Sequence, residues 1–312
     1  MAVRLKYQEV IDACELDSLC MNPAAAEYLI KNCEHLNWKV LSSNADPVAV
    51  NFLMQNPGEI QWEMFSANKN PAAVEFLLRT PENISWWGLS KNESPVAVEY
   101  LLRFPEYINW WNFSGNMQAL AVEFLINNPD NIRWYPFSEN EHPAAVAYML
   151  ENLEHVYFKP FSKNKNPAAV TFLLMDTDYV DWNHFSLNEH PAAVQFLAKH
   201  PDKIRWDGFS ANADLLAVEL LTKHPKRINW EAFSGNSNEL AVAFAVKHIA
   251  NTDLTVLARN PGLFEPDYRT MCASAVAGFS DELRAIALKP KNIALLLCDL
   301  MGRGGDIMDF SF

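Results

Sequence analysis

The stretch Pro-Ala-Ala-Val-Glu-Phe-Leu-Leu at residues 71–78 decides the fold, because close copies of it recur along the chain. Pro-Val-Ala-Val-Glu-Tyr-Leu-Leu stands at 95–102 and Pro-Ala-Ala-Val-Thr-Phe-Leu-Leu at 167–174, so the copies are separated by multiples of 24 residues. Numbering each copy from its first residue gives ten units, without insertion or deletion, over residues 23–262. Self-similarity at a fixed period of this length is typical of repeat proteins.

Several positions of the unit hold the same residue type in nearly every copy. Position 3 is alanine and position 22 is asparagine in all ten units, and position 20 is serine in nine. Position 6 is Tyr or Phe in nine units, position 16 is Trp in eight, and position 19 is Phe in seven. We therefore expect all ten units to fold and pack in the same way.

The pattern within a unit predicts two short helices. Apolar residues at positions 2, 3, 4, 6, 7 and 8 cover about 240° of a helical wheel, and an N-cap residue followed by proline marks the start of this helix. A proline at position 11 of most units disfavours helix in the residue before it. Caps at position 15 start a second helix, and the asparagine at position 22 is expected to close it with a left-handed backbone. The helices are about nine and six residues long.

One such unit cannot bury enough apolar surface to fold alone, so the units must stack. The sequence predicts an all-α protein: an α-solenoid of ten tandem 24-residue helical repeats at 23–262, with an N-terminal cap at 1–22 and a C-terminal helical cap and tail at 263–312. At the usual helix spacing, ten units would make a curved rod on the order of 80 to 100 Å long. A leucine-rich-repeat-like solenoid is the alternative, but it requires an apolar residue where position 17 is mostly polar.

The repeat resembles a known group of sequences. Asn-Pro-x-Ala-Val-x-Phe-Leu-Leu followed by Asn-Pro-x-x-Ile-x-Trp-x-x-Phe-Ser-x-Asn is similar to the short tandem repeats found in many predicted proteins of large DNA viruses. The resemblance spans residues 23–262 and implies a viral or phage source. It implies no activity and no catalytic residues.

Composition and motifs argue against several classes of function. With 25 Lys and Arg against 38 Asp and Glu, the net charge of −13 disfavours nucleic acid as a partner. The sequence contains no Gly-x-Ser-x-Gly, His-Glu-x-x-His, Walker or Gly-x-Gly-x-x-Gly motif, so we expect no enzyme, no catalytic residue and no cofactor. Asp176, Asp178, Asp181 and His184 cluster in unit 7, but they are interpreted as cap and loop residues, and no metal site is expected.

The sequence also suggests where the protein is found. No apolar run is long enough for a signal peptide or a membrane span, so no membrane association is expected. Five cysteines, an odd number, argue against a disulfide framework. We therefore expect a cytoplasmic protein in a reducing compartment.

Interaction through an extended surface is the usual role of a solenoid. The sequence favours a non-enzymatic scaffold that binds another protein, and the alternative is an architectural or self-assembling component. A reader of single-stranded nucleic acid is less favoured. The oligomeric state and the identity of the partner stay open.

Two sets of residues are singled out as sites. Position 17 is mostly polar but becomes aromatic in three consecutive units, where it follows the buried Trp of position 16 by about 100° and should therefore be exposed and bind a partner. The alternative is that local curvature packs these rings into the core, because the aromatic residues of this chain are mostly structural. Phe104 and Tyr107 are expected to extend this patch, which otherwise consists of Trp87, Trp111 and Tyr135. The position-22 asparagines are expected to form a structural ladder of side-chain amides between units: Asn44, Asn68, Asn92, Asn116, Asn140, Asn164, Asn188, Asn212, Asn236 and Asn260.

Overall fold

The structure is a computed structural model that describes residues 3–5, 22, 25–32 and 36–266. The chain divides into two compact units, one formed by Leu5–Glu265 and the other by Met1–Arg4 with Pro266–Phe312. The first contains all ten repeats and is described here. Apart from Asn22 and residues 3–5, the predicted N-terminal cap lies outside the described residues, as does the C-terminal cap beyond residue 266.

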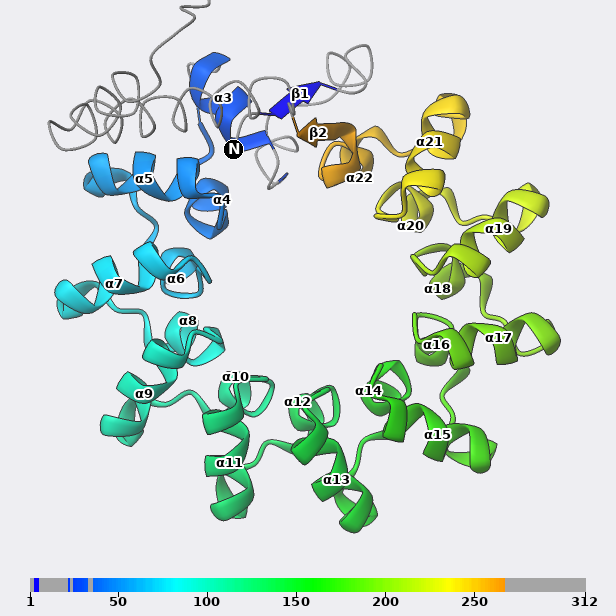
Figure 1. Ribbon diagram of the computed structural model, residues 1–312, viewed down its shortest axis with the longest axis horizontal. Helices are drawn as coiled ribbons and strands as arrows, with labels where there is room; N and C mark the ends of the chain where they lie inside the picture. Colours follow the sequence, from blue (N-terminus) through cyan, green and yellow to red (C-terminus); the bar gives the residue numbers. More distant parts are fainter. Residues whose placement is uncertain (1–2, 6–21, 23–24, 33–35, 267–312) are drawn as a thin grey trace, which may run out of the picture. The chain divides into compact units, whose positions relative to one another are not determined.

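The repeats consist of paired helices, which confirms the predicted all-α solenoid (Figure 1). The first helices of the units are α3 (Ala26–Asn32), α5 (Pro47–Gln55), α7 (Pro71–Arg79), α9 (Pro95–Arg103), α11 (Ala119–Asn127), α13 (Pro143–Glu151), α15 (Pro167–Met175), α17 (Pro191–Lys199), α19 (Leu215–Lys223) and α21 (Glu239–Lys247). The second helices are α4 (Trp38–Ser43), α6 (Trp62–Ser66), α8 (Trp86–Lys91), α10 (Trp110–Ser114), α12 (Trp134–Ser138), α14 (Phe158–Lys163), α16 (Trp182–Phe185), α18 (Trp206–Ser210), α20 (Trp230–Ser234) and α22 (Leu254–Leu257). Outside the repeats, β1 (Val3–Leu5) and β2 (Phe264–Pro266) form a two-stranded sheet.

Many of the helices begin at the N-cap residues that the sequence predicts. The Asn70 side chain accepts a hydrogen bond from the Ala72 amide at the start of α7, and the Asn109 side chain accepts one from the Asn112 amide at the start of α10. A short 3-10 helix such as Pro105–Tyr107 links the two helices of most units. The proline at position 11 begins this turn, where its fixed φ is suitable and its missing N–H costs nothing.

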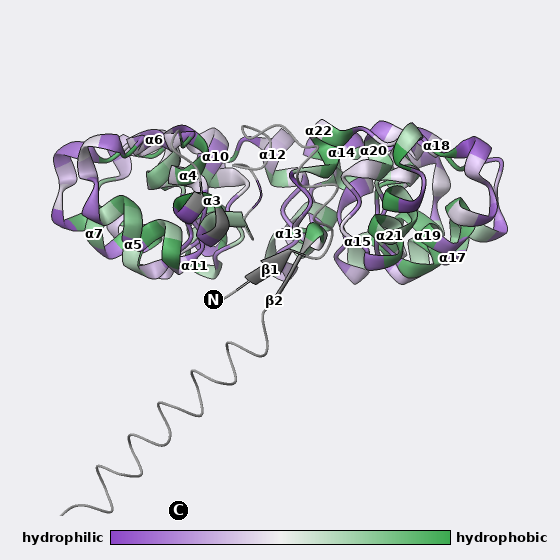
Figure 2. Cartoon of the chain, turned by 90° about the horizontal axis from the view of Figure 1, so that it is seen from above, coloured by the Kyte–Doolittle hydropathy of each residue, from purple (hydrophilic) through white to green (hydrophobic). Residues whose placement is uncertain are grey.

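Helices of the same kind pack against each other in neighbouring units, so that the short helices form one row and the longer helices the other (Figure 1). The alanine at position 3 is fully buried wherever it occurs, and so is every phenylalanine at position 19. Both rows contain hydrophobic and hydrophilic residues (Figure 2). The core therefore runs as a continuous layer between the rows, which a single unit could not supply.

The structure corrects two expectations about individual positions. Asn44, Asn92 and Asn164 follow short helices, but their backbone is extended, with ψ of 117°, 121° and 122°, rather than left-handed. The chain runs straight from this position into the cap of the next unit, so no reversal is needed. The tryptophans at position 16 are half-buried rather than buried.

Hydrogen bonds join the residue that precedes the first unit to the tenth unit. The side-chain amide of Asn22 donates hydrogen bonds to the carbonyls of Ala258 and Asn260, at 3.0 and 2.7 Å. Asn22 is fully buried, and these carbonyls belong to the tenth unit. The residue that precedes the first unit therefore occupies the place that the ladder asparagine of an eleventh unit would take. No helix in the described part of the chain is long and apolar enough to span a membrane.

Candidate interaction surface

Position 17 faces solvent in every unit, and in three consecutive units it carries a large aromatic ring. The exposed fractions are 43% for Trp87, 54% for Trp111 and 39% for Tyr135. These residues are the second residues of α8, α10 and α12, so each points about 100° away from the position-16 side chain before it. The exposure on which the predicted partner site depends is therefore present.

Two of these rings contact each other across neighbouring units, and a fourth aromatic residue extends the contact. The rings of Trp111 and Tyr135 are stacked, with centroids 6.0 Å apart and an interplanar angle of 12°. Tyr135 in turn meets the edge of Tyr157 at 5.6 Å, and Tyr157 is 53% exposed. Trp87 lies on the adjacent helix α8, where its carbonyl accepts a hydrogen bond from the Asn112 side chain at 2.9 Å. We call Trp87, Trp111, Tyr135 and Tyr157 the aromatic stripe.

Phe104 and Tyr107 are also exposed, at 38% and 48%, but their ring contacts are with other residues. Phe104 lies 5.2 Å from the ring of Tyr100, and Tyr107 stacks on Trp86 at 4.4 Å. The structure therefore brings Trp111 and Tyr135 together, adds Tyr157, and places Phe104 and Tyr107 against the rings of positions 6 and 16.

Tyr107 takes part in a contact that recurs between neighbouring units and that the sequence did not predict. The position-16 ring of one unit stacks on the position-6 ring of the next unit, as Trp110 does on Phe124 at 6.0 Å. In several units the position-13 residue of the next unit also lies against the position-16 ring. This residue is aromatic, histidine or cationic: Tyr107 on Trp86, His155 on Trp134, Tyr179 on Phe158, Lys203 on Trp182 and Arg227 on Trp206. The planar ring accepts all of these because its face attracts both rings and cations.

A surface pocket of about 440 Å³ opens beside the stripe. Its lining residues come from units 4 to 6: Trp111, Ile132, Arg133, Trp134, Tyr135, Glu154, His155, Val156 and Tyr157. Tyr157 occupies position 15, where most units have a capping residue, and this departure from the pattern is the signal that could have indicated it. Three residues of the stripe, Trp111, Tyr135 and Tyr157, therefore line this pocket.

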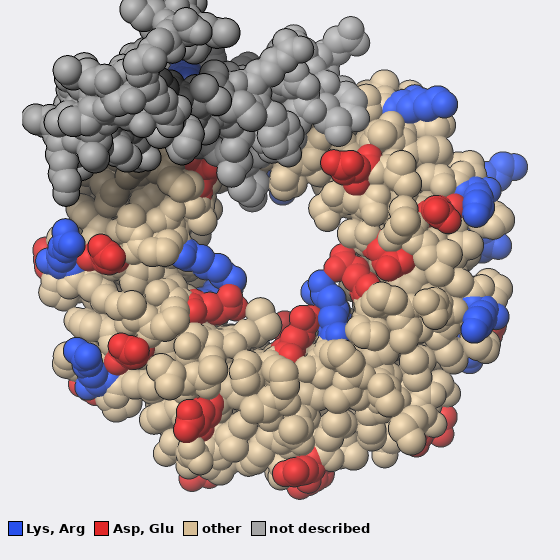
Figure 3. Space-filling view, viewed as in Figure 1, with Lys and Arg blue, Asp and Glu red and all other residues tan. Residues whose placement is uncertain are grey.

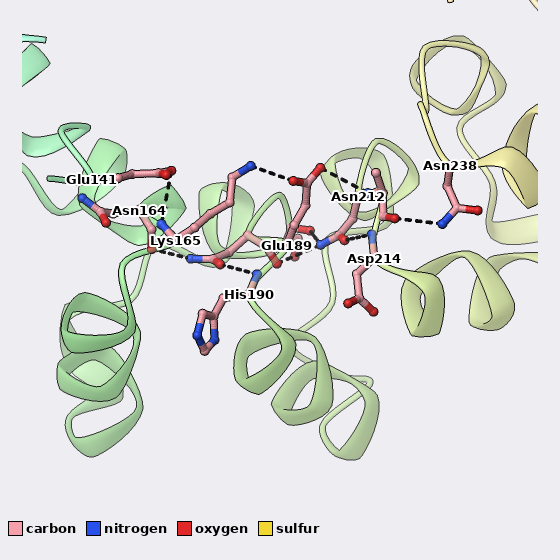
Figure 4. Close-up of polar contacts among 11 residues, drawn as sticks. Glu141, Asn164, Lys165, Glu189, His190, Asn212, Asp214 and Asn238 are labelled. Atoms are coloured by element: carbon pink, nitrogen blue, oxygen red, sulfur yellow. Dashed lines mark hydrogen bonds and ion pairs between the residues drawn. The ribbon is translucent and has the colours of Figure 1, made fainter. Parts of the chain in front are cut away.

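The position-22 asparagines bond each unit to the one before it. The side-chain amide of Asn140 donates to the carbonyls of Ser114 and Asn116, at 3.2 and 2.9 Å, and its side-chain oxygen accepts from the His142 amide at 3.0 Å. Equivalent bonds to the preceding asparagine carbonyl are made by Asn68, Asn92, Asn116, Asn164, Asn188, Asn212, Asn236 and Asn260, and Figure 4 shows part of this series. Asn44 stands at the start of the ladder, and its side-chain oxygen accepts from the Asp46 amide at 2.9 Å.

The serine at position 20 adds a second bond at each junction. The hydroxyl of Ser114 donates to the Trp110 carbonyl at 2.7 Å and accepts from the Arg133 amide of the next unit at 2.9 Å. All the buried side-chain polar atoms of the described residues have a hydrogen-bond partner. These polar columns are fully satisfied, and they hold the short helices in place beneath the aromatic stripe.

Charged residues often lie in pairs on the face shown in Figure 3. Lys165 bonds Glu189 of the next unit at 2.7 Å, and Lys69 bonds Glu93 in the same way at 2.6 Å. The hydrogen bond to Glu189 raises the pKa of Lys165, although burial opposes this shift. Position 12 is acidic and exposed in six consecutive units: Glu82, Glu106, Asp130, Glu154, Asp178 and Asp202.

The acidic cluster of unit 7 behaves as cap residues. The Asp181 carboxylate accepts a hydrogen bond from the His184 amide at 3.0 Å and lies 2.8 Å from the His184 ring nitrogen Nδ1. Burial alone would raise the pKa of Asp181, but the hydrogen bonds from His184 lower it overall. Among the described residues, no group of three His, Cys, Asp or Glu side chains is arranged to hold a metal ion.

Comparison with known proteins adds no family to this picture. No protein-family model matches the sequence, and no curated protein or solved structure matches it either.

Proposed function

We propose that the protein is a non-enzymatic scaffold that binds another protein through the aromatic stripe. The observation that carries this proposal is the exposure of large rings at position 17 in three consecutive units, beside a pocket of about 440 Å³. Contiguous exposed aromatic side chains mark interaction sites, because Trp and Tyr supply much of the binding energy in protein interfaces.

The surroundings of the stripe support this function. The helices α8 and α10 that carry its tryptophans have side-chain caps, and the serine and asparagine bonds beneath the stripe are made, so little ordering is needed when a partner binds. The Asn22 bonds favour a scaffold over a self-assembling component. They already occupy the carbonyls of the last unit, which a second copy could otherwise use to continue the ladder.

The proposal also includes the location and the source of the protein. A cytoplasmic, reducing location is supported by the odd number of cysteines, and a viral source is supported by the resemblance of the repeat. Neither is needed for the binding role.

The test compares two double variants in affinity capture from the native cell. Trp87→Ala with Trp111→Ala removes the two tryptophans of the stripe, and Glu63→Ala with Asn183→Ala changes the same position in units 2 and 7. We expect the first variant to lose the captured partner and the second to keep it, with similar thermal unfolding of both. Retention of the partner by the tryptophan variant would contradict the proposal.

A further inference from the structure

The aromatic stripe has the geometry of a groove for an extended chain. Two successive ring contacts of 6.0 and 5.6 Å join Trp111, Tyr135 and Tyr157 into one row. A polyproline II helix rises about 3.1 Å per residue and completes a turn in three residues, about 9 Å. The three rings therefore extend over little more than one such turn, so that prolines at positions i and i+3 of a ligand would lie over the two outer rings of the row, Trp111 and Tyr157.

The stripe also offers hydrogen-bond donors that such a ligand needs. A polyproline II chain has no internal hydrogen bonds and presents its carbonyls outward. The indole N–H of Trp111 and the hydroxyls of Tyr135 and Tyr157 form no hydrogen bond with any other residue described in the structure. They are available to donate to ligand carbonyls. Aromatic-lined grooves of this composition are one of the recurring ways in which proteins bind proline-rich segments.

The charged residues beside the stripe indicate which side chains a ligand would carry next to its prolines. Glu154 lines the pocket, and it belongs to the row of six acidic residues at position 12. Arg133 lines the same pocket, and its guanidinium is directed to the Asp130 carbonyl at 3.4 Å. With a net charge of −13, the surface disfavours an anionic ligand and complements a basic one.

We propose that the aromatic stripe binds a proline-rich segment with basic residues beside its prolines, held as a polyproline II helix. This inference rests on the proposed scaffold function and specifies the chemistry of its partner. The prolines pack on the rings, the ligand carbonyls accept from the indole and phenol groups, and the basic side chains reach the acidic row. Such a segment is largely extended before it binds, so its ordering cost is low.

The experiment uses the full chain and three fluorescent peptides in anisotropy titrations. The probe is Arg-Pro-Pro repeated four times, and the controls replace every proline by alanine or every arginine by glutamate. We expect the probe to bind at least about tenfold more tightly than either control, because each control loses one of the two complementary features. Equal binding of the probe and the alanine control overturns the inference.

Protein variants locate the site. We expect Trp111→Ala with Tyr135→Ala to weaken the probe by about tenfold or more, and Glu154→Gln to weaken it severalfold. Glu63→Ala with Asn183→Ala should leave binding unchanged, and circular dichroism checks that each variant is folded. Unchanged binding to a folded Trp111→Ala, Tyr135→Ala protein overturns the inference, as does displacement of the probe by an oligosaccharide or by single-stranded RNA at a lower concentration than the unlabelled probe requires.

The two proposals fail in different ways. If the tryptophan variant loses its cellular partner but the probe does not bind, the scaffold function stands and the proline-rich ligand is wrong. If the tryptophan variant keeps its partner, the scaffold function through this surface is wrong whatever the peptides do.

Discussion

Trp110 and Trp111 are adjacent in α10 but face different surroundings. Trp110 is half-buried, stacks on Phe124 of the next unit at 6.0 Å and meets the edge of Phe113 at the same distance. Trp111 is 54% exposed, and its ring contact is with Tyr135, which is exposed as well. The same residue type thus joins the units on one face of the short helix and remains open to solvent on the other. Residue type alone does not assign a role in this protein; the position in the unit does.

The largest expected effect is on the buried face. Phe113 is fully buried at position 19, so Phe113→Ala should lower the free energy of unfolding by about 3 to 5 kcal/mol, through lost packing and the cavity that it leaves. Phe104→Ala is the matched control in the same unit, because Phe104 is 38% exposed. Its cost should be about 1 kcal/mol or less. Urea unfolding of both variants measures the two losses of unfolding free energy. Equal losses would show that the buried and the exposed phenylalanine do not differ in their contribution to stability.

The asparagine ladder gives the next largest effect. Asn140→Ala should cost about 1 to 3 kcal/mol, because it leaves the buried carbonyls of Ser114 and Asn116 without this donor. Asn127→Ala in the same unit is exposed at the end of α11 and should be nearly neutral. Thermal unfolding of the two variants makes the comparison. An Asn140→Ala protein that melts like the wild type would refute a structural role for the ladder.

The smallest effect concerns the charged pairs at the surface. Glu189→Gln should destabilise by less than about 1 kcal/mol at pH 7, because the pair with Lys165 is partly exposed. The pKa of Lys165 is raised above 10.5, so the contribution of the pair is present below that pH and disappears as the pH rises further. Unfolding midpoints of the wild type and the variant should therefore differ at pH 7 and converge above about pH 10.5. A difference that persists or grows at high pH would contradict this assignment.

The repetition in the sequence was enough to predict the fold of the unit. Ten copies in register specify the caps, the nine-residue helix and the short helix, because the same local signals recur in every unit. The exposure of Trp87 and Trp111 also follows from the 100° step between positions 16 and 17.

The features that the sequence did not reveal depend on how the units are arranged. The rotation from one unit to the next decides which residues the tenth unit meets, and no single residue encodes it. Asn22 also lies outside the ladder register, so nothing in the column marks it as the donor to Ala258 and Asn260.

The pairing of position 13 with position 16 was missed for a different reason. Tyr107, Lys203 and Arg227 share a contact geometry but no residue type.

The most direct test of the account is urea unfolding of Trp110→Ala beside Trp111→Ala. If position 16 joins the units and position 17 is free for a partner, Trp110→Ala should lower the unfolding free energy by at least about 2 kcal/mol, and Trp111→Ala should change it by less than about 1 kcal/mol. A Trp111→Ala protein that is destabilised as much as Trp110→Ala would show that the exposed ring is part of the structural framework, and it would contradict the account.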